Sequence, residues 1–312
     1  MKTMFVLFVL FLQSVTWAQV PNWKGKLETK NNVRYVHNPR EGVWGHDPAK
    51  KMKVTRIFSL GSLNAEEEYL FSWVKDIATD RNGNIYACDS RENRIQVYDK
   101  SGKYIRTMGR KGKGPGELLR PMAIVVDDRG KIYVQDDLNK RVSIFKNNGK
   151  FYKSFNYKYF GIAGEQIDLD PSGNVLICHY SSYYGKARKL STFPIVTAYN
   201  LKGKVMQKYG KPQLLIEKNG YGMAQYSGNG FVSRRDGTLI VYFSYPYLIH
   251  FYKQGQLVKV IDRVDPVFTK PEIMETKFTV FDGRVDKIKA VVYRSSIRYL
   301  HILPDGKFIV CI

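Results

Sequence analysis

The sequence predicts an all-β fold, a β-propeller of four-stranded blades, from an internal repeat and from the residue types inside it. Residues 77–102 recur at residues 124–149, shifted by 124 − 77 = 47 positions without a gap. Each copy contains short runs of Val, Ile, Tyr and Phe, separated by Asp, Asn, Ser and Gly. Such runs are typical of strands joined by tight turns, and a period of about 40 to 50 residues indicates propeller blades.

Four strands are expected in the first unit, over residues 74–79, 85–87, 95–98 and 104–108. A tight turn joins the first two strands. Asp80 opens this turn, because a short carboxylate accepts backbone N–H bonds there, and Gly83 closes it, because glycine adopts positive φ without a Cβ clash. A sheet this small must bury both faces, so successive blades are expected to pack face to face around an axis.

Weaker copies extend the pattern along the chain. Residues 167–173 open a third unit whose last strands follow an insertion at 181–194, and turns at 235–237 and 304–306 mark a fourth and a fifth unit. We therefore expect four successive antiparallel sheets, within residues 73–119, 120–162, 163–226 and 227–292. The predicted protein is of the six-bladed type and stops after the start of its fifth blade. The alternative is a complete five-bladed ring, in which residues 33–37 and 53–60 complete the fifth blade.

The N-terminal region divides into two predicted parts before the blades at residues 73–312. Residues 1–18 resemble a secretory signal peptide, with Lys2 before an apolar run too short to span a bilayer and with small residues at a cleavage site. Residues 19–72 would carry, at 53–61, the outer strand that closes the last blade. No later run is long and apolar enough for a membrane helix, so the expected location is the periplasm or the exterior.

The three cysteines each lie five residues after the turn glycine of a blade. Cys88, Cys178 and Cys311 therefore occupy equivalent second-strand positions in blades one, three and five. Equivalent positions in non-adjacent blades are too far apart for a disulfide, so we expect three reduced, buried thiols.

The formal net charge of +22 attracts polyanions. The basic residues, however, are spread over nearly every turn and form no run of five or six like charges. Diffuse solubilising charge is the simpler interpretation. The expected partner is an anionic glycan, an unknown protein or another anionic ligand. The protein is expected to be a monomer. Nucleic acid is not an expected partner of an exported protein.

Two segments carry a resemblance to a known family. Residues 89–98 and 136–145, with the glycine-rich loop at 109–117, resemble the NHL repeat of secreted bacterial six-bladed β-propellers. The resemblance implies the fold and leaves the function open, because that scaffold carries lyases, lactonases, sensor domains and RNA-binding domains. Relatives with catalytic activity use metal ligands or acidic residues on the channel axis.

The recurring pairs Asp89/Arg94 and Asp136/Arg141 could be acid/base pairs. A catalytic pair is needed once, whereas a pair repeated in each blade indicates a structural clasp between strands. We predict no catalytic residue, no metal ligand and no cofactor. The preferred function is an exported, non-enzymatic binding or scaffold module. The alternative is a metal-dependent lyase or lactonase-type hydrolase with a site on the channel axis.

The predicted ligand site lies at the mouth where the second-to-third strand loops meet the loops between blades. The insertion contributes aromatic and basic side chains that suit stacking on sugars and pairing with carboxylate or phosphate. The glycine-rich loop contributes further cations, although its sequence is that of a turn and not of a phosphate-binding loop. The candidate ligand-binding residues are Arg91, Arg110, Lys111, Lys113, Tyr183, Tyr184, Lys186, Arg188 and Lys189.

Overall fold

The computed structural model describes most of the predicted blade region. The described residues are 25–38, 58–61, 66–157, 162–180, 182–186, 194–211, 213–216, 221–225, 230–243, 248–263, 272–279, 285–292, 299–302 and 308–311. The predicted signal peptide at 1–18 lies outside them, as do residues 53–57 of the predicted ring-closing strand. Residues 58–61 of that segment belong to no strand.

The two closest repeats form two four-stranded antiparallel blades in the predicted order. Blade one consists of β3 (Val74–Thr79), β4 (Ile85–Asp89), β5 (Arg94–Tyr98) and β6 (Tyr104–Met108). Blade two consists of β7 (Pro121–Val126), β8 (Ile132–Asp136), β9 (Arg141–Phe145) and β10 (Phe151–Asn156). In each blade, every strand pairs with the next strand along the chain.

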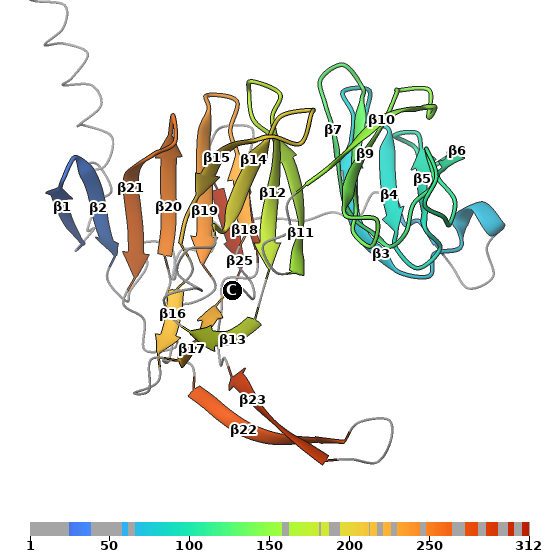
Figure 1. Ribbon diagram of the computed structural model, residues 1–312. Coiled ribbons are helices and arrows are strands. Elements are labelled where there is room, and N and C mark those ends of the chain that lie inside the picture. Colours follow the sequence, from blue (N-terminus) through green and yellow to red (C-terminus); the bar gives the residue numbers. More distant parts are fainter. Residues whose placement is uncertain are drawn as a thin grey trace, which may run out of the picture.

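Two further blades confirm the predicted succession of separate sheets, which Figure 1 shows side by side. Blade three consists of β11 (Ile162–Leu169), β12 (Val175–Tyr180), β14 (Val196–Tyr199) and β15 (Val205–Tyr209). Blade four consists of β18 (Gly230–Ser233), β19 (Thr238–Phe243), β20 (Leu248–Lys253) and β21 (Gln256–Arg263).

The remaining strands refine the predicted segment boundaries. The insertion pairs with a later part of its own segment in a three-stranded sheet, ordered β13 (Ser182–Lys186), β17 (Tyr221–Gln225) and β16 (Gln213–Ile216). The predicted fourth segment extends to residue 292, whereas the last strand of blade four ends at Arg263. Beyond it lie two separate hairpins, β22 (Glu272–Thr279) with β23 (Val285–Val292) and β24 (Tyr299–Ile302) with β25 (Phe308–Cys311).

An N-terminal hairpin extends blade four. Its strands are β1 (Lys26–Lys30) and β2 (Val33–Asn38), and β2 runs parallel to β21 at the outer edge of that blade. The alternative five-bladed arrangement, which placed residues 33–37 in a fifth blade, is therefore wrong for this segment. Covering the edge of β21 also protects unpaired backbone groups from association with another chain.

The hydrophobic core is divided into layers between neighbouring blades, as the propeller prediction requires. Each layer combines one face of a blade with the opposing face of the next. Between blades one and two lie Tyr86, Cys88, Ile95, Val97 and Met108, packed with Ile124, Ile132, Val134 and Phe145. Between blades two and three lie Tyr133, Val142, Ile144, Phe155, Ile167, Val175, Ile177 and Tyr199. Between blades three and four lie Leu176, Cys178, Val196, Ala198, Phe231, Leu239, Val241 and Phe243.

The first-to-second strand turns have the predicted hydrogen bonds. Asp80 Oδ1 accepts the backbone N–H groups of Asn82 and Asn84, both at 2.9 Å, and Gly83 has a φ of 81°. The Tyr86 hydroxyl donates to the other carboxylate oxygen at 3.2 Å. The same bonds recur around Asp127, so each turn is held by its own carboxylate.

The thiols of Cys88 and Cys178 form no disulfide and are buried in different inter-blade layers, as predicted. The side chain of Cys311 in β25 lies outside the described side chains. Burial raises the pKa of the Cys178 thiol to about 12, which leaves almost none of the reactive thiolate at neutral pH.

We expect native protein to resist iodoacetamide at Cys88 and Cys178, and urea-unfolded protein to react fully at both. Peptide mass spectrometry after a short pulse at pH 8 measures this. An intramolecular disulfide between two of the three cysteines in non-reduced samples would contradict the assignment of these residues to separate blades.

Candidate functional site

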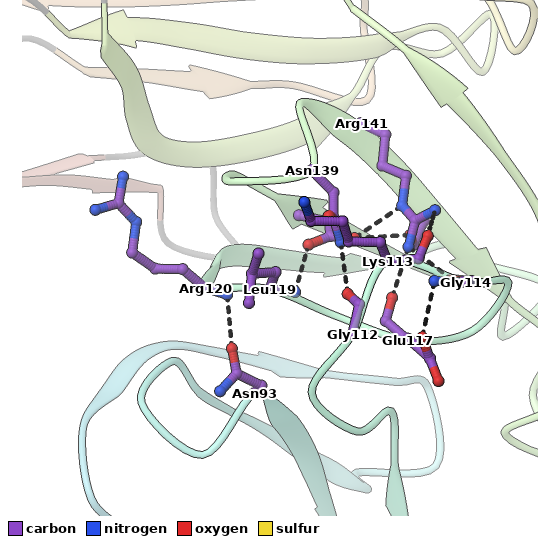
Figure 2. A network of polar contacts seen from close by, with 11 residues as sticks. Asn93, Gly112, Lys113, Gly114, Glu117, Leu119, Arg120, Asn139 and Arg141 are labelled. Atoms are coloured by element: carbon purple, nitrogen blue, oxygen red, sulfur yellow. Dashed lines mark hydrogen bonds and ion pairs between the residues drawn. The ribbon is translucent and has the colours of Figure 1, made fainter.

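The loops at one end of blades one and two form a single connected surface. The backbone N–H of Arg120 donates to Asn93 Oδ1 at 2.8 Å, which joins the linking loop to the second-to-third strand turn of blade one. Asn139, in the corresponding turn of blade two, donates to the carbonyl oxygen of Gly112 at 3.0 Å. Figure 2 shows these residues around one network. The predicted meeting of the two kinds of loop is thus present.

Arg141 holds the linking loop in place. Its Nε donates to Asp136 Oδ2 at 2.8 Å, and its terminal nitrogens donate to the carbonyl oxygens of Lys113 at 3.0 Å, Gly114 at 2.9 Å and Glu117 at 2.7 Å. One guanidinium therefore binds three carbonyls of the loop that carries the predicted basic residues (Figure 2). A planar group with five N–H donors suits this role.

The carboxylate of Asp136 is the buried centre of this clasp, with 0% exposure. It also accepts the backbone N–H of Leu119 at 2.7 Å and the side-chain amide of Asn139 at 2.8 Å. Burial raises the pKa of Asp136 above its ordinary value. The hydrogen bonds from Asn139, Leu119 and Arg141 oppose this shift without cancelling it. All of these contacts are internal, so the interpretation of the pair as a structural clasp fits the geometry.

Blade one has the same clasp in a looser form. Arg94 Nε lies 4.0 Å from Asp89 Oδ2, and Arg94 donates to a single carbonyl, that of Leu70, at 2.8 Å. Asp89 accepts the backbone N–H groups of Ser72 at 3.1 Å and Trp73 at 2.9 Å. In both blades the carboxylate therefore binds the chain that enters the first strand.

The predicted site residues of the glycine-rich loop differ in their contacts. Arg110 forms an ion pair with Glu117 at 3.0 Å, and the second oxygen of Glu117 accepts the backbone N–H of Gly114 at 2.8 Å. The Gly114 hydrogen bond, followed by Arg110, lowers the pKa of Glu117. Arg110 is thus paired with a carboxylate of its own loop. The side chains of Lys111 and Lys113 are exposed, as is that of Arg91.

The insertion lies at the same end of the blades. The second strand of blade three ends at Tyr180, and β13 begins two residues later at Ser182. Tyr183 and Tyr184 lie in β13 opposite Ala224 and Met223 of β17. The strand also contains the third predicted residue, Lys186, whereas Arg188 and Lys189 lie outside the described residues.

Polar side chains on the inner strands connect one blade to the next. Asp76 Oδ2 accepts the backbone N–H of Ile124 at 2.9 Å, and Gln166 Oε1 accepts that of Phe231 at 2.9 Å. Within the part of the chain that the structure describes, no group of three His, Cys, Asp or Glu side chains could hold a metal ion. The described residues thus offer no ligand set for the metal-dependent alternative.

A cavity of about 810 Å³ lies at the opposite end of the blades, which sequence reasoning did not select. The first-to-second strand turns of blades two, three and four surround it. Its charged lining includes Arg129 and Lys131 of blade two, Asp168 of blade three, and Arg234 and Arg235 of blade four. Asp168 could have been found from the sequence, because its equivalents in blades one and two are Ala78 and Val125.

Asp168 has an unusual environment for a carboxylate. Its Oδ1 accepts the backbone N–H of Leu169 at 2.8 Å, and its Oδ2 accepts that of Ser233 in blade four at 3.3 Å. Burial nevertheless raises the pKa of Asp168 to about 6, because removal from water disfavours the charged form more than these two bonds favour it.

Asp168→Asn should stabilise the protein near pH 7.5 by roughly 1–3 kcal/mol, since a shift of one pKa unit corresponds to about 1.4 kcal/mol. The folded-state pKa lies above the ordinary value, so the protonated carboxyl favours folding below about pH 4. That contribution disappears as the pH rises through 6. Urea unfolding at pH 4 and pH 7.5 measures the difference. A variant that gains stability only at pH 4 would contradict the raised pKa.

Comparison with protein families supports the fold assignment. Residues 45–141 match a family model described as a 6-bladed beta-propeller. The fold is that of a six-bladed propeller. No curated protein matches the chain. Among the described residues, no helix is long and apolar enough to cross a membrane.

Solved structures with similar folds have low sequence identity to this chain. A Bacteroides fragilis protein named as exported is 17% identical, with a TM-score of 0.51, and the match covers 67% of this chain and 56% of that one. A Bacteroides caccae protein of unknown function is 10% identical, with a TM-score of 0.43 and coverage of 76% and 70%. A Staphylococcus aureus virginiamycin B lyase is 9% identical, with a TM-score of 0.38 and coverage of 71% and 85%.

The chain therefore spans just over half the length of the B. fragilis protein. That similarity shows a propeller fold and, at 17% identity, carries no activity or ligand over to this chain.

Proposed function

We propose that this protein is an exported binding module without catalytic activity, which holds an anionic ligand or partner on the loop-bearing end of its blades. One observation carries the proposal: Arg141 fixes the backbone of the linking loop through three carbonyl bonds. The loop presents the exposed side chains of Lys111 and Lys113 on this fixed backbone. Loops held rigidly by a scaffold bind with a smaller loss of conformational entropy.

The surrounding charge supports an anionic ligand. The exposed side chain of Arg91 belongs to the turn that Asn93 connects to the linking loop. The net charge of +22 adds a long-range attraction for anions. We also propose that Tyr183, Tyr184, Lys186, Arg188 and Lys189 of the insertion form a second part of the site. We further propose that residues 1–18 are a signal peptide and that the repeats are NHL-like.

The test uses heparin as a polyanionic glycan probe, titrated at two salt concentrations. The double variant Lys111→Ser/Lys113→Ser should weaken binding about fivefold, if each cation contributes about 0.5 kcal/mol. The dependence on salt should also decrease, because screening acts on the charges that were removed. The matched control is Lys100→Ser/Lys146→Ser, which removes the same charge from turns at the other end of blades one and two.

The insertion has its own variants. Replacing Lys186, Arg188 and Lys189 by Ser should lower the affinity for heparin and reduce its salt dependence. Replacing Tyr183 and Tyr184 by Ser should lower the affinity and leave the salt dependence unchanged. If the control variant loses as much affinity as the loop variant, diffuse surface charge explains the binding and the proposed site is wrong.

A further inference from the structure

The repeats provide an internal comparison for the cavity at the turn-bearing end of the blades. Asp168 lies five residues before the turn glycine of blade three, and its equivalents in blades one, two and four are Ala78, Val125 and Val232. Three blades therefore form the same strand with an apolar side chain at this position. The fold does not require a carboxylate there, and a partly buried one has an unfavourable desolvation cost.

Arg234 is a second departure from the repeat. It lies three residues before the turn glycine of blade four, where blades one, two and three have Asp80, Asp127 and Asp170. The turn still forms, because Arg234 N–H donates to the Thr238 carbonyl at 2.9 Å and Gly237 N–H donates to the Arg234 carbonyl at 3.0 Å. An arginine thus replaces an acidic anchor without loss of the turn.

Both departures line the same cavity. They are also adjacent, since Asp168 accepts the backbone N–H of Ser233, the residue before Arg234. From the facing turn of blade two, Arg129 and Lys131 contribute two more cations to the lining, and Arg235 contributes another from blade four. The two departures from the repeat lie in neighbouring blades and face one cavity. A binding site explains this arrangement better than random substitution does.

The remaining lining indicates which chemistry fits. The neutral groups include the hydroxyl and amide side chains of Ser172, Asn174 and Asn200, which suit a hydrophilic ligand. The other lining carboxylates, Asp127, Asp128 and Asp170, already have partners within the protein. Asp127 and Asp170 accept hydrogen bonds within their own turns, and Asp128 forms an ion pair with Arg81 of blade one. Asp168 can accept a ligand hydroxyl, since each carboxylate oxygen has two acceptor sites.

The cationic side chains suit an acidic group on the ligand. Arg234 also contacts Asp236 at 3.5 Å, and a guanidinium with five N–H donors can bind a second anion at the same time. A volume of about 810 Å³ lies in the range of small-molecule sites. We propose that this cavity binds an anionic sugar, with the acidic group between Arg129 and Arg234 and a sugar hydroxyl on Asp168. This site is separate from the proposed site at the loop-bearing end.

The test measures binding of three soluble probes, glucuronate, glucose 6-phosphate and glucose, by titration calorimetry on the full chain. At least one of the two anionic sugars should bind about tenfold or more tightly than glucose, as expected for a charge-assisted bidentate contact. Comparison of glucuronate with glucose 6-phosphate identifies a carboxylate or a phosphate as the acidic group. Equal binding of all three probes, or no binding of the anionic ones, would overturn the proposal.

The variants restore the residues that the other blades use. Arg234→Asp and Asp168→Val each introduce a side chain already present at that position of the repeat, so both should fold, which thermal unfolding verifies. Each should weaken binding of the anionic sugar about tenfold or more. Lys100→Ser/Lys146→Ser, a pair outside both proposed sites, should leave it unchanged. Wild-type affinity in both cavity variants would overturn the site, and a loss confined to Lys111→Ser/Lys113→Ser would assign the sugar to the loop-bearing end.

Discussion

Arg141→Ala should lower the free energy of unfolding by about 3–5 kcal/mol, the range for breaking a buried ion pair from one side. The variant leaves the fully buried carboxylate of Asp136 without its 2.8 Å partner. It also removes the donor to the carbonyls of Lys113, Gly114 and Glu117, of which the last two are bound at 2.9 and 2.7 Å. Urea unfolding followed by tryptophan fluorescence and by circular dichroism measures the loss.

Arg94→Ala is the matched control in blade one. Its guanidinium lies 4.0 Å from Asp89 and binds one loop carbonyl, so the expected loss is smaller, about 1–2 kcal/mol. Because the two arginines occupy the same repeat position, the difference between the variants measures the closer ion pair of Arg141 and its two additional carbonyl contacts together. An equal loss in both variants would show that those contacts contribute little.

The same substitution tests the proposed function. Freed from Arg141, the linking loop should be more mobile, and heparin affinity should fall although no exposed cation has been removed. Measuring binding at a temperature well below the unfolding transition separates this effect from global unfolding.

The blades could be predicted from the sequence because their information is local. Asp80 and Gly83, repeated 47 positions later as Asp127 and Gly130, define a turn, and the alternating apolar runs define the strands on either side. The clasp could be predicted for a related reason, since the recurrence of Asp89 with Arg94 indicated a structural role. The inter-blade layers follow, because both faces of each blade are apolar.

The pairings that the sequence did not predict join segments distant along the chain. The register of β2 with β21 connects residues more than 200 positions apart, for example Val36 with Ile261. The pairing of β13 with β17 connects two segments that lack the blade motif. Local periodicity identifies such segments as strands and does not specify their partners, since many apolar strands satisfy the same alternation.

The cavity was missed for a different reason. The ligand face predicted from the sequence rests on loop length and composition, whereas the short first-to-second strand turns carry only a structural prediction. Asp168 was a readable signal, since a carboxylate stands where the other blades have Ala or Val. Its significance depends on its burial and on its position beside the Arg234 turn, which only the packing of blades three and four reveals.

Ile124→Ala should lower the free energy of unfolding by about 2–5 kcal/mol, the range for removing a buried isoleucine side chain to alanine. Ile124 lies in the layer between blades one and two and is 3% exposed. Its methyl groups pack among side chains from both sheets, so the truncation leaves a cavity that neither blade can close alone. Thermal and urea unfolding of the full chain provide the measurement.

Ile77→Ala supplies the control, because Ile77 occupies the same repeat position in blade one with 60% exposure. No described residues form a blade against that side of β3, and an exposed side chain contributes little to stability, so the expected change is within about 0.5 kcal/mol. The two variants delete identical atoms from equivalent backbones, and only the presence of a neighbouring blade differs. A loss from Ile77→Ala as large as that from Ile124→Ala would mean that another part of the protein, or another molecule, covers blade one in solution.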